Sequence, residues 1–161
     1  MTVAEYNQCV HDFADRLFRF VLKNLRDNDE ARDIVQETFE KMWIKHETVT
    51  YSKARSYLFT TAYHTLIDFT RKAGRTGEWR PELETVQTIL QPKHDLQENL
   101  EWALSQIPEI QRTTILLRDY EGYSYEEIGK ITSLSESQVK VYIYRGRMAL
   151  RKLIGNPEVL I

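Results

Sequence analysis

Two serines, each followed by apolar residues at helical spacing, most tightly constrain how this 161-residue chain can fold. Ser124 precedes a short apolar stripe and Ser135 precedes a longer one, and serine is a preferred helix N-cap. Only residues 132–134 separate the two stripes. The segment therefore predicts a helix, a tight turn and a second helix, with Leu134 packed between the two helices.

The first half of the chain also has a helical period. Apolar residues recur three and four positions apart in residues 10–25, 31–42 and 54–69, and Asn28 or Asp29 is placed to cap the second of these helices. No alternation of apolar and polar residues, typical of a strand, competes with this pattern. We therefore expect an all-α chain that begins with a small bundle of helices.

The helical period is interrupted in residues 76–95, which contain Pro81 and Pro92 and mixed charges. We interpret this stretch as a linker, although a few apolar residues at helical spacing allow it to include a short docked helix. The chain is thus predicted to form two small helical domains, residues 1–75 and 96–161, the second ending in the helix-turn-helix.

The charge of the chain is unevenly distributed. The net charge is -2 and the pI is about 6.1, so nucleic-acid binding would have to come from a local basic cluster. The last helix carries such a cluster, with Glu136 as its one opposing acid. A basic C-terminal helix can simply complement its own dipole, but here it coincides with two caps and a turn leucine, which favours DNA binding. The candidate base- and phosphate-contacting residues are Ser137, Gln138, Lys140, Val141, Tyr144, Arg145 and Arg147.

The helix predicted over residues 54–69 is rich in aromatic residues. Tyr57 and Phe69 fall on its apolar stripe and are expected in the core, whereas Phe59 and Tyr63 fall beside it. Aromatic rings among cations suit unpaired bases, on which they stack. The candidate single-strand residues are Arg55, Phe59, Tyr63, His64, Arg71 and Lys72.

Several classes of protein are disfavoured. The only cysteine, Cys9, cannot form an internal disulfide, and the chain has neither a signal-peptide pattern nor an apolar run long enough to cross a bilayer, so we expect a cytoplasmic protein without membrane insertion. The four histidines are scattered without metal-ligand spacing. Phosphate-binding glycine loops and nucleophile motifs are missing, so we expect no enzyme, no metal and no cofactor.

Three stretches resemble one family. The segment LSQIPEIQRTTILLRDYEGYSYEEIG with the helix-turn-helix resembles the fourth conserved region of extracytoplasmic-function sigma factors, group 4 of the sigma-70 family. DEARDIVQETFEKMW is similar to the polymerase-binding helix of that family, and SYLFTTAYHTLIDFTRK to its -10 helix. The chain departs from the family at His64, Gln138 and Gly146, where asparagine, threonine and alanine are common. Gly146 should cost the helix about 1 kcal/mol relative to alanine.

The resemblance implies a division of labour. The first domain would be region 2, which binds core RNA polymerase and recognises and melts the -10 element; the second would be region 4, which recognises the -35 element. Asp33, Gln36, Glu37 and Trp43 match positions that bind a coiled coil on the largest polymerase subunit. The loop at residues 46–53 would capture a flipped base, with Tyr51 as the stacking residue. Further implied partners are the flap of the second-largest subunit, double-stranded and melted promoter DNA, and an anti-sigma factor.

Two other interpretations remain open from the residues alone. A stand-alone helix-turn-helix regulator would use the first domain for dimerisation or sensing and would bind a palindromic operator. A protein-binding adaptor would use the acidic second helix, whose polar face is otherwise explained as an ordinary solvated surface.

Overall fold

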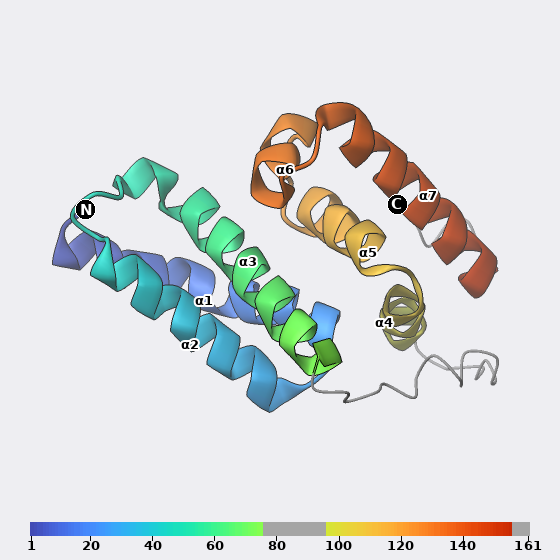
Figure 1. Cartoon of the computed structure of the whole chain (residues 1–161), viewed down its shortest axis with the longest axis horizontal. Helices are drawn as coiled ribbons and strands as arrows, with labels where there is room; N and C mark the ends of the chain where they lie inside the picture. The colour runs from blue at the N-terminus through green and yellow to red at the C-terminus, as the bar shows by residue number, and fades with distance from the viewer. Residues whose placement is uncertain (76–95, 156–161) are drawn as a thin grey trace. The chain divides into compact units, whose positions relative to one another are not determined.

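The computed structural model describes residues 1–75 and 96–155, which fall into two compact units, Met1–Gly77 and Glu78–Ile161 (Figure 1). Every regular element in these described ranges is helical, which confirms the predicted all-α fold class. The predicted linker at residues 76–95 lies outside the described residues. None of the helices in the described part is both long and apolar enough to cross a membrane.

Unit 1 is a bundle of three helices that all contact one another: α1 (Val3–Leu25), α2 (Asn28–Ile44) and α3 (Ala54–Arg75). A single 3-10 turn, η1 (Tyr51–Lys53), leads into α3. Each helix turns its apolar stripe toward the other two, as the sequence predicts. The buried side chains of this core include Leu17, Val21, Ile34, Met42, Leu58 and Leu66.

The starts of the first two helices differ from the prediction. α1 begins at Val3 because Thr2 and Glu5 form a capping box, in which each side chain accepts a hydrogen bond from the backbone N–H of the other. The cap of α2 is Asp27, whose carboxylate accepts the Glu30 N–H at 2.9 Å; the assignment to Asn28 or Asp29 was wrong. Arg26 ends α1 in a left-handed conformation, φ 61°, which leaves Asp27 as the first extended residue before α2.

Unit 2 is built around its last helix, α7 (Glu136–Ile154), which packs against α4 (Leu96–Gln106), α5 (Glu109–Ile115) and α6 (Tyr125–Thr132). α5 continues directly into a π-helical segment, η3 (Leu116–Tyr120). The buried side chains of unit 2 include Leu104, Leu116, Leu117, Ile128, Val139, Ile143 and Leu150.

The two helices of the predicted helix-turn-helix and both of their caps are confirmed, and Leu134 in the turn is half-buried. Ser124 forms a capping box with Glu127 at the start of α6, and Ser135 forms one with Gln138 at the start of α7. Between the two helices, Ser133 adopts a left-handed conformation with φ 62°. The two capping boxes therefore determine locally where α6 and α7 begin.

Gly129 allows the turn to close tightly on α6. The Leu134 N–H donates to the Gly129 carbonyl at 2.9 Å, and a Cβ added at Gly129 would lie 2.6 Å from the Leu134 carbonyl oxygen. We expect Gly129→Ala to lower the free energy of unfolding of unit 2 by about 1–2 kcal/mol, because overpacking against backbone outweighs the better helix propensity of alanine. Urea denaturation checks this, with exposed Lys130→Ala as the control. Equal midpoints for both variants would mean that the turn adjusts without cost.

Gly146 has a comparable role between α5 and α7. It is buried, and a Cβ there would lie 2.5 Å from Cδ1 of Ile115 and 3.2 Å from Cβ of Gln111. From the sequence alone, Gly146 is expected only to destabilise its helix relative to alanine. The structure shows what compensates for this cost: the absence of a side chain lets α5 and α7 approach each other closely.

Candidate nucleic-acid interface

The side of α7 that faces away from the unit 2 core carries most of the predicted DNA-binding residues. Val139, Ile143, Gly146 and Leu150 are buried, so the opposite side of the helix meets solvent. The exposed predicted residues are Ser137, Gln138, Lys140, Val141, Tyr144 and Arg145. Among them Val141 and Tyr144 keep 43% and 66% of their surface exposed, so both side chains are accessible to a partner.

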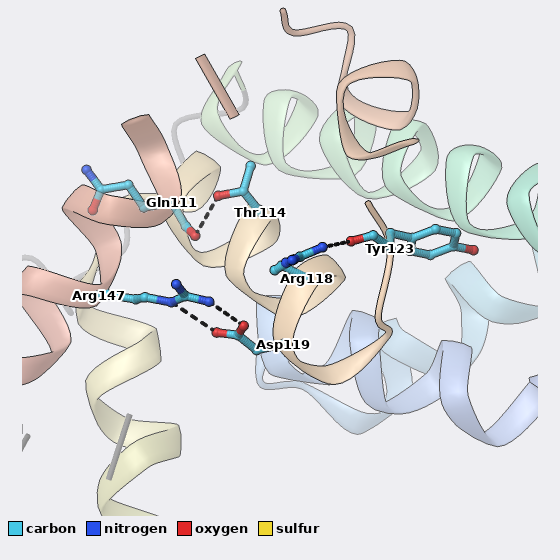
Figure 2. Close-up of polar contacts among 6 residues, drawn as sticks. All are labelled: Gln111, Thr114, Arg118, Asp119, Tyr123 and Arg147. Atoms are coloured by element: carbon cyan, nitrogen blue, oxygen red, sulfur yellow. Dashed lines mark hydrogen bonds and ion pairs between the residues drawn. The ribbon is translucent and has the colours of Figure 1, made fainter. Parts of the chain in front are cut away.

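Arg147 is placed differently from the rest of this set. Its guanidinium forms a two-point ion pair with the carboxylate of Asp119 in η3, with a shortest distance of 2.5 Å (Figure 2). This pair joins the middle of α7 to η3 across 28 positions of sequence. Arg147 therefore helps to orient the helix in the free protein, and its role as a DNA contact stays a prediction.

Cations also surround the start of α6. Arg118 donates to the Tyr123 carbonyl at 3.0 Å (Figure 2), and its guanidinium lies 4.4 Å from the centre of the Tyr125 ring. The ammonium of Lys140 lies 5.5 Å from the same ring and 3.4 Å from Glu136. Such exposed pairs contribute less than about 1 kcal/mol each, so Lys140 can exchange them for a phosphate.

The predicted single-strand surface on α3 needs correction. Phe59 is fully buried, with its ring edge-on to Phe20 at 5.4 Å, and Tyr63 is only 8% exposed. Tyr57 and Phe69, which the sequence assigns to the core, are half-buried. The physical reason is that α3 packs against both α1 and α2, so its buried arc is wider than one apolar stripe.

The remaining residues of that surface are more accessible. His64, Arg71 and Lys72 are exposed on α3, and Tyr51 is 42% exposed in η1. Arg55 is half-buried, with its guanidinium 5.9 Å from the centre of the Phe59 ring. The structure thus leaves His64, Arg71 and Lys72 at the surface and buries the rings of Phe59 and Tyr63.

The polar face of α2 is exposed as expected. Asp33, Gln36 and Glu37 all lie at the surface, where Glu37 pairs with Lys41 at 2.9 Å. Trp43, at the end of the same helix, is 43% exposed. A binding surface needs accessible side chains on a rigid element, and α2 provides both.

A groove beside Trp43 escapes prediction from the sequence. It has a volume of about 540 Å³ and lies between α1 and the end of α2, lined by Val3, Tyr6, Asn7, Glu40, Trp43 and Ile44. The Trp43 ring stacks on His46 at 4.2 Å and meets the edge of Tyr6 at 5.0 Å. The available signal was the spacing of Val3, Tyr6 and Val10, which extends the first apolar stripe to the helix start.

No group of three metal-ligating side chains occurs within residues 1–75 and 96–155. Cys9 is buried in α1, and burial raises the pKa of its thiol, which keeps the sulfur protonated and unreactive at neutral pH.

Both units are similar to regions of known proteins. Residues 9–76 match the model of sigma-70 region 2, and residues 97–150 match that of sigma-70 region 4. The RNA polymerase sigma factor SigV of Bacillus subtilis is 30% identical over 146 residues, covering 89% of this chain and 87% of the relative. The chain belongs to the sigma-70 family. The ECF RNA polymerase sigma factor SigM of Bacillus subtilis, 28% identical over 97% of both chains, places it in the extracytoplasmic-function subfamily.

A solved relative agrees with this sigma factor in fold. The sigma factor RpoE of Bartonella quintana, crystallised with the anti-sigma factor NepR, superposes with a TM-score of 0.78 at 24% identity, over 95% of this chain and 98% of that one. Region 2 corresponds to most of unit 1, and region 4 to α4, α5, η3, α6 and most of α7. The chain is therefore a promoter-recognising transcription initiation factor, which sets aside the stand-alone regulator and the adaptor.

Proposed function

We propose that unit 1 of this sigma factor binds core RNA polymerase and acts at the -10 element, while unit 2 recognises the -35 element in the major groove. The observation that carries the proposal is the exposed side of α7, held by two capping boxes and the Arg147–Asp119 pair. A recognition helix enters the major groove with its early turns at the base edges and its cations near the phosphates. Ser137, Gln138, Val141 and Tyr144 occupy those turns, and Arg145 follows them.

The proposed polymerase contacts are exposed side chains of α2: Asp33, Gln36, Glu37 and Trp43. Their partner would be the coiled coil of the largest subunit, and unit 2 would contact the flap of the second-largest. An anti-sigma factor would hold the protein inactive by covering these surfaces; the solved relative was crystallised in complex with an anti-sigma factor. The protein would work in the cytoplasm and catalyse no reaction itself, since nucleotide addition belongs to the polymerase.

At the -10 element, the proposed contacts are the accessible residues Tyr51, His64, Arg71 and Lys72, together with the half-buried Arg55. Tyr51 supplies the ring on which an unpaired base can stack, a contact worth about 1–3 kcal/mol per base. The cations attract the strand backbone.

Transcription reconstituted from purified components tests the function. The full chain is mixed with sigma-free core polymerase of the native host and genomic DNA fragments, and the 5′ ends of the transcripts are sequenced. We expect defined starts, each preceded by two shared motifs. If no start depends on the protein, the proposed division of labour at the promoter fails.

Arg145→Glu should lower -35-dependent transcription at least tenfold and leave polymerase binding unchanged. The substitution replaces attraction to a phosphate by repulsion, and Arg145 is exposed, so the fold is retained. Run-off transcription and co-purification with core measure the two properties. Arg19→Glu on the exposed surface of α1 is the matched charge control. Loss of polymerase binding together with transcription would contradict the division of labour.

A further inference from the structure

The capping box at the start of α7 limits what Gln138 can offer to DNA. The Ser135 N–H donates to Oε1 of Gln138 at 2.9 Å, and the Gln138 N–H donates to Oγ of Ser135 at 3.1 Å. A backbone N–H can only donate, so the amide atom that faces Ser135 is the oxygen. The amide nitrogen, with its two N–H groups, is the atom that Gln138 retains for a ligand.

The hydrogen bond between Oε1 of Gln138 and the Ser135 N–H changes the base preference of the Gln138 side chain. An unconstrained glutamine pairs with adenine through both amide atoms, accepting from N6 and donating to N7. With its oxygen engaged, Gln138 acts as a donor and requires an acceptor on the base edge. Thymine O4, the guanine acceptors and adenine N7 can accept from it, whereas cytosine presents only an amino group, which opposes it.

Val141 lies one turn further along the exposed side of α7. It is 43% exposed, and the side chains of α7 that reach the core, such as Val139 and Ile143, are on the other side of the helix. Residues three positions apart on a helix are neighbours, with Cβ atoms roughly 5–6 Å apart. The apolar group that a major groove presents to such a valine is the C5 methyl of thymine.

We propose that Gln138 and Val141 together make the -35 surface selective for thymine. Gln138 donates from Nε2 to O4, and Val141 packs on the C5 methyl of the same thymine or of its neighbour. Guanine and adenine each offer Gln138 an acceptor but offer Val141 no methyl group, and cytosine satisfies neither residue. The inference rests on the proposed function of α7 and specifies which base that helix selects.

Four pyrimidines allow the contributions of the O4 atom and the C5 methyl group of thymine to be measured separately. Thymine has O4 and the methyl group, uracil has O4 alone, 5-methylcytosine has the methyl group with an amino group in place of O4, and cytosine has the amino group alone. Each is placed in turn, with its complementary purine, at every thymine position of the -35 element found by 5′-end mapping. Abortive initiation by the full chain bound to core polymerase measures promoter strength.

The wild-type protein should lose about fourfold in promoter strength when uracil replaces thymine at one position, which corresponds to one methyl group no longer buried. 5-methylcytosine should cost about tenfold or more there, because two donors then face each other. Equal strength of thymine and uracil at every position would overturn the role of Val141.

Two variants test whether Val141 recognises the methyl group and Gln138 recognises O4. Val141→Ala should no longer distinguish thymine from uracil but should still disfavour both cytosines. Gln138→Glu retains the capping box, since glutamate is a standard partner at that position, and presents a carboxylate oxygen in place of the donor. It should therefore favour cytosine over thymine, accepting from the cytosine amino group. Val10→Ala, at an exposed valine of α1, is the matched control and should behave as wild type.

The outcomes distinguish failure of the thymine selectivity from failure of the sigma function on which it rests. Defined starts with a wild-type preference for thymine that survives Gln138→Glu would overturn the donor role of Gln138 alone. Defined starts without any thymine preference would overturn the inference and leave the sigma function standing. Absence of protein-dependent starts would overturn both.

Discussion

Replacing Asp33 and Glu37 together by lysine is expected to weaken binding to core RNA polymerase by about 100-fold or more. Both carboxylates are exposed on α2, and reversing two charges at an interface converts attraction to repulsion at each position. The fold should be retained, because the exposed Glu37–Lys41 pair that is lost contributes less than about 1 kcal/mol. Co-purification with core polymerase and a competition titration against the wild-type protein measure the loss.

The control for this double variant carries the same charge change on another helix. Asp12 and Asp15 are exposed acids of α1, and their replacement by lysine alters the net charge equally without touching α2. We expect that control to bind polymerase within about threefold of wild type, allowing for long-range electrostatics. Undiminished binding by the Asp33 and Glu37 variant would refute α2 as the polymerase surface.

The helix-turn-helix could be predicted from the sequence because its determinants are local. Ser124 and Ser135 act on backbone groups three residues away, and the sequence itself shows that spacing. The cap of α2 could not be predicted in the same way. Asp27 caps that helix because Arg26 takes a left-handed conformation, which arginine rarely adopts and no local pattern indicates.

The errors at the candidate site come from contacts between distant residues. The sequence also did not indicate that Arg147 pairs with Asp119, which lies 28 positions away on another element. Helical periodicity describes one face of one helix, so it cannot show that α3 is covered from two sides. The groove beside Trp43 likewise depends on how α1 and α2 pack together.

For Gln138, the sequence predicts the position of the residue at the DNA surface but not which of its amide atoms is available to DNA. The sequence places it among the base-contacting positions and also makes it the third residue after Ser135. Its exposure supports the first role, and its hydrogen bond to Ser135 establishes the second. Because one amide atom serves the cap, the chemistry available to DNA follows from the fold and not from the residue type alone.

Phe59→Ala is expected to lower the free energy of unfolding of unit 1 by about 3–5 kcal/mol, which is the usual cost of removing a buried aromatic ring. Phe59 has no solvent-exposed surface and packs edge-on against Phe20, so alanine would leave a cavity where α1 and α3 meet. Hydrogen exchange of backbone amides in α1 and α3 measures the change, and the amides of α7 in the same sample serve as an internal reference.

Two further variants decide between a core role and a base-stacking role for this ring. Phe59→Leu should recover most of the stability, since it restores volume, and Tyr51→Ala should change stability by less than about 0.5 kcal/mol because Tyr51 is 42% exposed. Strand opening should show the reverse ranking, with Tyr51→Ala the more impaired. If Phe59→Ala kept native exchange rates but lost strand opening, its ring would contact DNA and would not belong to the core.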